Sequence, residues 1–182
     1  MNPIFQKNEP VLRAHAKPVL HFNTAELQEL IEKMARALFA EPDGIGIAAP
    51  QMGISLQVFL VASDVLSPIM LDQRLHEAEK KKKLSTKAIS TDQYMVFINP
   101  TFQKISKKKM SDIEGCLSVR GFYGDVARPE KVTIEYYTQE GIKKTRGASN
   151  LFARVLQHEM DHLQGMLFVD KAKNIQKINE KN

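Results

Sequence analysis

The stretch LFARVLQHEMDHLQ, residues 151–164, decides the fold of this chain. Its apolar side chains recur at the three- and four-residue spacing of an α-helix and form two adjacent stripes. The stripes are Leu151, Val155, His158 and His162, and beside them Phe152, Leu156, Glu159 and Leu163. Because both stripes begin with apolar residues, we expect this face of the helix to pack against a sheet. Gly165 is placed to end the helix.

The second half of this helix carries an HExxH motif. His158 and His162 lie one turn apart on the same face, so both imidazoles can bind one ion. Glu159 is close enough to approach a water on that ion without being a ligand itself. Two buried imidazoles and a carboxylate on an apolar face cost free energy unless a divalent cation compensates them. The pattern therefore indicates a metal-dependent hydrolase, although two satisfied core histidines would be the ordinary alternative.

The motif alone leaves the third ligand open. One class of zinc peptidases continues it with a glycine and a third histidine, but Phe168 stands where that histidine should be. Another class takes a glutamate from a downstream helix, and here only Asp170 and Glu180 follow. We therefore expect the third ligand upstream. The candidates there are several carboxylates together with Cys116, His15, His21 and His76.

The rest of the chain predicts an α+β domain. A helix is expected over residues 23–40, where Asn23 and Glu26 resemble a capping pair. Residues 63–93 are polar and rich in lysine, and we expect a long irregular excursion containing a short helix. Strands are expected at 57–62, 94–99 (closed by Pro100), 102–105, 113–119, 131–137 and 142–146. The predicted fold is antiparallel sheet segments packed around a central HExxH-bearing helix.

Composition predicts one domain over residues 1–182, ending in a basic tail at 170–182. No apolar run approaches the roughly 20 residues of a membrane span. The single cysteine forms no internal disulfide, so the expected compartment is the cytoplasm. The net charge of +5 comes largely from lysines at 80–83, at 107–109 and in the tail. No aromatic residues interleave with the two internal runs, which favours solvated loops over a nucleic-acid surface; for the tail, contact with ribosomal RNA stays open.

Three segments together resemble the peptide deformylase family. They are GIGIAAPQ at 44–51, EGCLS at 114–118, and QHEMDH at 157–162 followed by Gly165. They are similar to the family's GxGxAAPQ, EGCLS and QHExDHxxG motifs, in the same order and at compatible spacings. The resemblance extends from about Ile4 to Asp170, which is nearly the whole chain.

The resemblance implies an activity and a cofactor. The family removes the formyl group from N-formylmethionyl peptides, so the expected partners are newly made polypeptides, with a transient ribosome contact through the basic surface and no membrane or DNA. It also implies one divalent ion, with Fe²⁺ the expected native metal and Zn²⁺, Ni²⁺ or Co²⁺ able to replace it.

Carried onto this sequence, the resemblance assigns roles to individual residues. It implies that Cys116, His158 and His162 hold the metal, and that Glu159 is the general acid and base. The Gln51 side chain and the Leu117 backbone N–H would stabilise the negative charge of the reacting oxygen, and Glu114 would pair with Arg128. Substrate contacts are expected from the backbone of Ile45 and Gly46 and, around the methionine side chain, from Leu151 and Val155, with Phe122 or Tyr123 near them.

The sequence departs from the family pattern at three positions. Arg120 and Ala127 stand where proline is common in relatives, and Arg154 is charged where relatives often carry an apolar residue. We expect these residues to alter the mouth of the peptide groove. Two other hypotheses remain: a zinc endopeptidase, which Phe168 weakens, and a silent peptide-binding module, which would have no use for Glu159.

Overall fold

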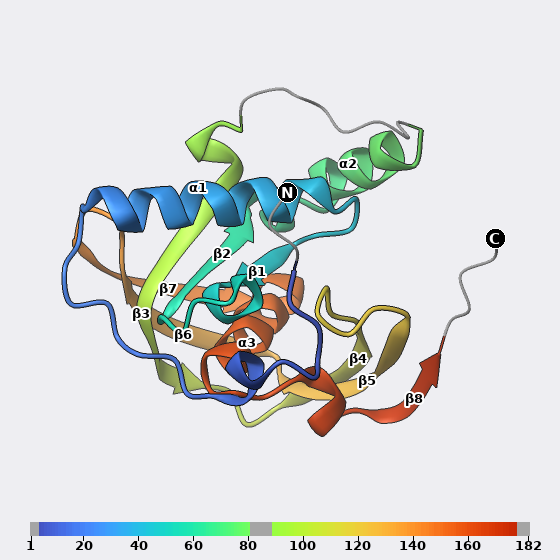
Figure 1. Ribbon diagram of the computed structural model, residues 1–182. Coiled ribbons are helices and arrows are strands. Elements are labelled where there is room, and N and C mark those ends of the chain that lie inside the picture. The colour runs from blue at the N-terminus through green and yellow to red at the C-terminus, as the bar shows by residue number, and fades with distance from the viewer. Residues whose placement is uncertain (1–3, 81–88, 178–182) are drawn as a thin grey trace.

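Two antiparallel sheets organise the chain, and the computed structural model describes residues 4–80 and 89–177 of it (Figure 1). The larger sheet has the strand order β1-β2-β3-β6-β7, and the smaller has the order β4-β5-β8. The strands are β1 Gly46–Ala48, β2 Val58–Ala62, β3 Tyr94–Ile105, β4 Lys109–Glu114, β5 Phe122–Pro129, β6 Lys131–Tyr137, β7 Lys143–Ser149 and β8 Lys173–Lys177. The prediction of an α+β domain with antiparallel sheet segments is confirmed.

The helices cover both faces of the larger sheet (Figure 1). They are α1 Ala25–Ala40, α2 Pro68–Lys80 and α3 Asn150–Leu163, with short 3-10 turns η1 Pro10–Arg13, η2 Ala49–Met52, η3 Ser63–Leu66, η4 Thr91–Gln93 and η5 Phe168–Asp170. Strand β2 shows why both faces are buried, because alternate side chains point to opposite sides of a strand. Leu60 shares a buried cluster with Leu38 of α1, whereas Phe59 shares another with Leu156 of α3.

Helix α1 begins later than its predicted cap. The expected capping residue, Asn23, lies outside the helix in a left-handed conformation with φ of 56°. Thr24 is the N-cap instead, and its Oγ1 accepts a hydrogen bond from the N–H of Leu27 at 3.2 Å. Either side chain can cap a helix, so composition alone could not decide between them.

Strand β3 runs through Pro100, so the prediction that this proline closes the strand is wrong. The pairing of β3 with β6 shifts register between Ile98 and Thr101, and a bulge of this kind accommodates a residue without an N–H donor. Asn99, at φ of 47°, holds the bend. Its side-chain amide exchanges two hydrogen bonds of 2.8 Å with the backbone of Val19.

Two strands of the smaller sheet were not predicted. β5 pairs with the whole length of β4, and β8, which comes from the basic tail, pairs with the other edge of β5. The excursion after β2 contains α2, whose 13 residues make it longer than the short helix expected there. Residues 81–83 of the first lysine run and 178–182 of the tail lie outside the described residues. None of the described helices is both long and apolar enough to cross a membrane.

The C-terminus of α3 is closed by Gly165, as the sequence predicted. Gly165 has φ of 72° and donates its N–H to the carbonyl of His162, while the N–H of Met166 reaches back to Asp161. This pair of hydrogen bonds is the Schellman motif, which favours glycine at the left-handed position. The turn fixes the end of the helix that carries both histidines.

We expect Gly165→Ala to destabilise the protein by about 1–3 kcal/mol, because the conformation is left-handed. An added Cβ would also lie 2.6 Å from the carbonyl oxygen of Arg13. Gly147→Ala in β7 is the matched control, since its Cβ would meet nothing within 4 Å. The free energies of unfolding from urea titrations test this. Equal values for the two variants would show that the turn does not constrain residue 165.

Candidate metal centre

Helix α3 presents its polar motif at the edge of an apolar core. Its first turns bury Phe152 and Leu156 against the larger sheet, and the helix also contacts β5 of the smaller sheet. His162 is 1% exposed and Glu159 is 3% exposed, whereas His158 is only partly covered. The apolar first half of the helix therefore fixes the depth at which the second half holds its titratable side chains.

Cys116 lies in a turn after β4, and the prediction that it sits within a strand over 113–119 is wrong. The turn closes with a hydrogen bond of 2.9 Å from the N–H of Val119 to the carbonyl of Cys116. Gly115 lets the chain leave β4 here, because a Cβ would stand 2.7 Å from the ring of Tyr123. The N–H of Ser118 points back to Sγ of Cys116 at 3.4 Å.

The structure brings Cys116, His158 and His162 together. One ligand atom from each lies within 4.8 Å of the others, and Sγ of Cys116 is 3.3 Å from Nε2 of His162. A thiolate with two imidazoles is a donor set that suits zinc or iron(II). Two buried atoms beside it, Oε2 of Glu159 and Nδ1 of His162, have no hydrogen-bond partner among the described residues. The site therefore fits a divalent cation.

A buried carboxylate stands behind His158. Oε2 of Glu114 lies 3.0 Å from Nδ1 of His158, which leaves the other ring nitrogen facing the cation site. Nε and Nη2 of Arg128 donate hydrogen bonds to the same carboxylate at 2.6 and 2.8 Å. These contacts confirm the ion pair that the family resemblance implied. Burial by itself would raise the pKa of Glu114, but hydrogen bonds from Arg128 and His158 hold that pKa well below its usual range.

Arg154 is a further member of this network that the sequence did not identify. Its Nη1 donates to Oε1 of Glu114 at 2.6 Å, and its other hydrogen bonds reach the carbonyls of Val126 and Met110. The side chain is buried and therefore joins α3 to both β4 and β5. The available signal in the sequence was Arg154 itself, a charged residue on the metal-bearing helix where relatives often carry an apolar one.

Both the oxygen and the nitrogen of the Gln51 side-chain amide form hydrogen bonds within the protein. Its Oε1 accepts from the N–H of Ala48 at 2.8 Å, and its Nε2 donates to Oγ of Ser118 at 3.1 Å and approaches Sγ of Cys116 at 3.6 Å. Gln51 is 1% exposed. Since the carbonyl oxygen is occupied by the backbone, the amide N–H₂ group faces the thiol side of the site.

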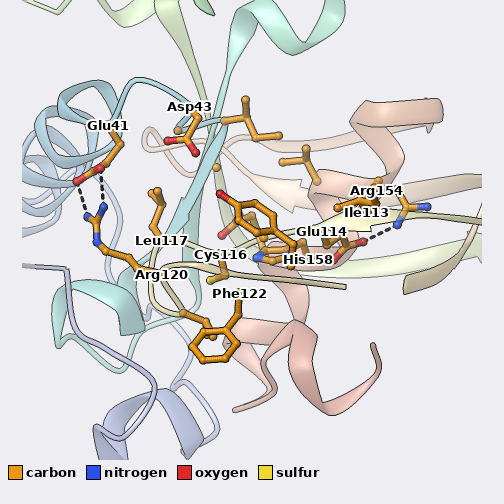
Figure 2. Close-up of a pocket in the computed structure, with 18 of the residues that line it drawn as sticks. Glu41, Asp43, Ile113, Glu114, Cys116, Leu117, Arg120, Phe122, Arg154 and His158 are labelled. Carbon is orange, nitrogen blue, oxygen red and sulfur yellow. Dashed lines mark hydrogen bonds and ion pairs between the residues drawn. The ribbon is translucent and has the colours of Figure 1, made fainter. Parts of the chain in front are cut away.

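A cavity of about 380 Å³ opens above these residues (Figure 2). This cavity is lined by all the residues expected at the metal, in catalysis or on the substrate except His162: Ile45, Gly46, Gln51, Cys116, Leu117, Leu151, Val155, His158 and Glu159. Phe122 and Tyr123 line it as well. Leu151 stands at its edge with 37% of its surface exposed.

Burial and close packing against Gly46 set the environment of the Glu159 carboxylate. Burial raises the pKa of Glu159 to about 7, and a cation held by the three donors would lower it again. A Cβ on Gly46 would collide with the Glu159 carboxylate, so only glycine leaves room for it there. The strand β1 and the glutamate are thus packed against each other directly.

The endopeptidase hypothesis gains nothing from the described residues. Phe168, at the position of a third histidine, is buried and stacks on His158 with ring centroids 6.4 Å apart. Asp170 is engaged elsewhere, because it accepts from Arg13 at 2.5 Å and from the N–H of Leu167. Glu180 lies outside the described residues.

An antiparallel α+β fold that sets an HExxH helix beside a cysteine turn defines a class, the metal-dependent hydrolases. The sequence profile named Polypeptide deformylase matches residues 1–178. The peptide deformylase of Christiangramia forsetii is 37% identical over 175 residues, covering 96% of this chain and 83% of that protein. That of Microchaete diplosiphon is 38% identical over 164 residues, covering 90% and 75%.

Solved structures agree with the sequence relatives. The crystal structure of peptide deformylase from Thermotoga maritima matches with a TM-score of 0.76 at 29% identity, covering 95% of this chain and 98% of that one. The enzyme from Synechococcus elongatus, solved in complex with actinonin, matches with a TM-score of 0.74 at 34% identity, covering 95% and 79%. The chain belongs to the peptide deformylase family, whose members are metal-dependent hydrolases that remove the formyl group from N-formylmethionyl polypeptides.

We expect Glu114→Gln to weaken metal binding by roughly 10- to 100-fold, because the partner that orients a ligating histidine contributes about that much. The measurement is competition for Zn²⁺ against a chromophoric chelator. Glu135→Gln is the control, since it makes the same chemical change in a side chain that pairs with Lys143 at 2.8 Å, outside the Glu114 network. Unchanged affinity in Glu114→Gln would mean that the carboxylate does not support a metal ligand.

Proposed function

We propose that Cys116, His158 and His162 hold one divalent cation, Fe²⁺ in the cell, and that this site removes the formyl group from N-formylmethionyl polypeptides and releases formate. Zn²⁺, Ni²⁺ or Co²⁺ can replace the iron. The observation that carries the proposal is the convergence of the three donor atoms, within 4.8 Å, beside the buried Glu159 carboxylate at the base of one cavity. In this proposal α3 is the central element, because it supplies three of these four side chains.

When bound, the cation acts as a Lewis acid that lowers the pKa of a coordinated water by several units, to about 7. Glu159 takes the proton of the attacking water, because its Oε2 is buried and has no hydrogen-bond partner among the described residues. The water oxygen bonds to the formyl carbon, and the bond from that carbon to the methionine nitrogen then breaks. Glu159 returns the proton to the departing amine, so that one carboxylate serves as base and then as acid.

Negative charge develops on the formyl oxygen during this attack. The amide N–H₂ group of Gln51 and the backbone N–H of Leu117 would donate to it, each contributing about 3–4 kcal/mol. The support is positional: both residues line the cavity beside Cys116, and Gln51 is already oriented through its bond from Ala48. The hydroxyl of Ser118, which accepts from Gln51 at 3.1 Å, keeps that amide turned toward the turn that carries the cysteine.

The peptide itself would be bound along β1. Among the described strands, β1 pairs only with β2 and lies at the edge of its sheet. The Ile45 carbonyl already accepts a hydrogen bond from the N–H of Ala62 at 3.0 Å, so an extended peptide that adds as a further strand would bind the backbone of Gly46 and the remaining backbone groups of Ile45. Leu151 and Val155, which line the same cavity from α3, provide apolar walls for the methionine side chain. The proposal keeps a single catalytic domain over residues 1–182. It also keeps the cytoplasm as the compartment, because the substrate arises at translating ribosomes.

Ribosome contact would use the smaller sheet. The lysines of β8 in the tail, Lys173 and Lys177, are exposed. Exposed lysines on one strand favour a phosphate backbone through charge, without base readout. The tail at 170–182 is thus in part a strand of this sheet.

The direct test is formate release from formyl-Met-Ala-Ser under anaerobic conditions, with the protein loaded with Fe²⁺ or Ni²⁺. We expect turnover by the wild type and a loss of about 10²- to 10⁴-fold in Glu159→Gln, which keeps the shape of the side chain but cannot transfer the proton. Metal content, measured on the same samples, should be equal, because Glu159 is not a ligand. Turnover that survives in Glu159→Gln would contradict the role of Glu159 in proton transfer. Absence of formate from the metal-loaded wild type would contradict the proposed reaction.

A further inference from the structure

Residues 5–7 run beside the turn that follows β4 (Figure 1). The backbone N–H of Phe5 donates to the backbone carbonyl of Gln51 at 2.9 Å, and Nε2 of Gln6 donates to the carbonyl of Leu117 at 3.2 Å. Gln51 and Leu117 supply the two proposed donors to the formyl oxygen, although they come from different elements, η2 and the turn after β4. One short segment therefore contacts both of these residues.

Two further contacts fix the ends of this segment. The ring of Phe5 lies against Gly53, the C-cap of η2, where an added Cβ would stand 2.7 Å from the ring. The ammonium group of Lys7 lies over the ring of Phe122, 4.5 Å from its centroid. Phe122 lines the cavity, whereas residues 5–7 do not. The segment therefore acts on the site from outside it, through the residues that it contacts.

Hydrogen bonds on both sides of Leu117 orient its N–H. This N–H shares a planar peptide unit with the carbonyl of Cys116, which accepts from the N–H of Val119 at 2.9 Å. The carbonyl of Leu117 belongs to the next peptide unit, and this is the unit to which Gln6 donates. Because only the two backbone dihedral angles of Leu117 separate the two units, holding both of them limits how far the N–H can turn.

The Gln6 amide is itself held by a second hydrogen bond. Its Nε2 also donates to the carbonyl of Ile4 at 3.0 Å, so the two hydrogens of this nitrogen have separate acceptors. Ile4 is buried, and Leu117 packs against the apolar cluster that contains it. Gln6 is exposed, so water competes for its hydrogen bonds and the expected effect on the reaction is modest.

We propose that Gln6 is a positioning residue for the removal of the formyl group. Through the carbonyl of Leu117 it keeps the N–H of that residue directed at the formyl oxygen. The inference rests on the proposed function, because it concerns a donor of that same site. A donor that is needed only when charge develops on the oxygen stabilises the transition state more than the bound substrate. Its misalignment therefore lowers kcat and leaves KM nearly unchanged.

The experiment compares Gln6→Met with the wild type, because methionine has nearly the same length but no donor. Steady-state kinetics with formyl-Met-Ala-Ser and Ni²⁺-loaded protein, expressed per bound metal, should show kcat lowered by about three- to tenfold and KM changed by less than about twofold. Gln103→Met is the matched control. Nε2 of Gln103 donates to Oγ1 of Thr101 at 3.2 Å, and neither residue lines the cavity, so kcat of this variant should equal that of the wild type.

Amide hydrogen exchange provides a second measurement, which needs no substrate. The N–H of Val119 is protected by its bond to the carbonyl of Cys116, which closes the turn. In Zn²⁺-loaded Gln6→Met this N–H should exchange faster than in the wild type by at least about twofold, because the turn opens more often. The amides of β6 should keep their wild-type rates, which separates a local change from a general loss of stability.

A kcat of Gln6→Met within about twofold of the wild type, or a higher KM at unchanged kcat, would overturn the inference. An equal loss of kcat in Gln103→Met, or unchanged exchange at Val119, would overturn it as well. Each of these kinetic results requires turnover by the wild type and so leaves the proposed function standing. Absence of formate from the metal-loaded wild type would instead contradict the proposed function, and the inference with it.

Discussion

The site depends on one buried carboxylate, that of Glu114. Arg128 from β5, Arg154 from α3 and the Nδ1 edge of His158 all meet it within 3.0 Å. A buried charge is tolerated only where paired and hydrogen-bonded groups compensate it, and here the compensating groups come from two elements, β5 and α3. The carboxylate therefore fastens α3 to the smaller sheet and, by the same contacts, sets the direction of a metal-ligand ring. The same interaction therefore supports both the packing of α3 and the orientation of a metal ligand.

Much of the site could be predicted because it is local. The i, i+4 histidine pair, the glutamate between them and the glycine after α3 are all readable from helical spacing, and the structure places them on one helix that ends at Gly165. The third donor could not be deduced in this way. Spacing left cysteine, histidine and carboxylate candidates open, and only the family resemblance selected Cys116, which lies 46 residues from His162 in the chain but 3.3 Å from it in space.

The features that sequence reasoning missed depend on partners far along the chain. The residues of β5 alternate in burial but not in polarity, because Arg128 occupies a buried position where it meets Glu114. The polar residues of this strand therefore resemble a loop in the sequence. Pro100 resembles a strand end until the bulge opposite β6 is known. Arg154 and Arg120 were visible only as departures from the family pattern. Their partners, Glu114 and Glu41, lie 40 and 79 residues away in the sequence, so these ion pairs can be identified only from the tertiary structure.

The central proposal is that the sulfur of Cys116 and the imidazole nitrogens of His158 and His162 would hold the metal. X-ray absorption at the zinc edge of the Zn²⁺-loaded protein tests it most directly. The account predicts one sulfur neighbour at about 2.3 Å and two nitrogen neighbours at about 2.0–2.1 Å, with the sulfur lost in Cys116→Ser. A first coordination shell without sulfur, or one that is unchanged in Cys116→Ser, would contradict the assignment of the metal centre.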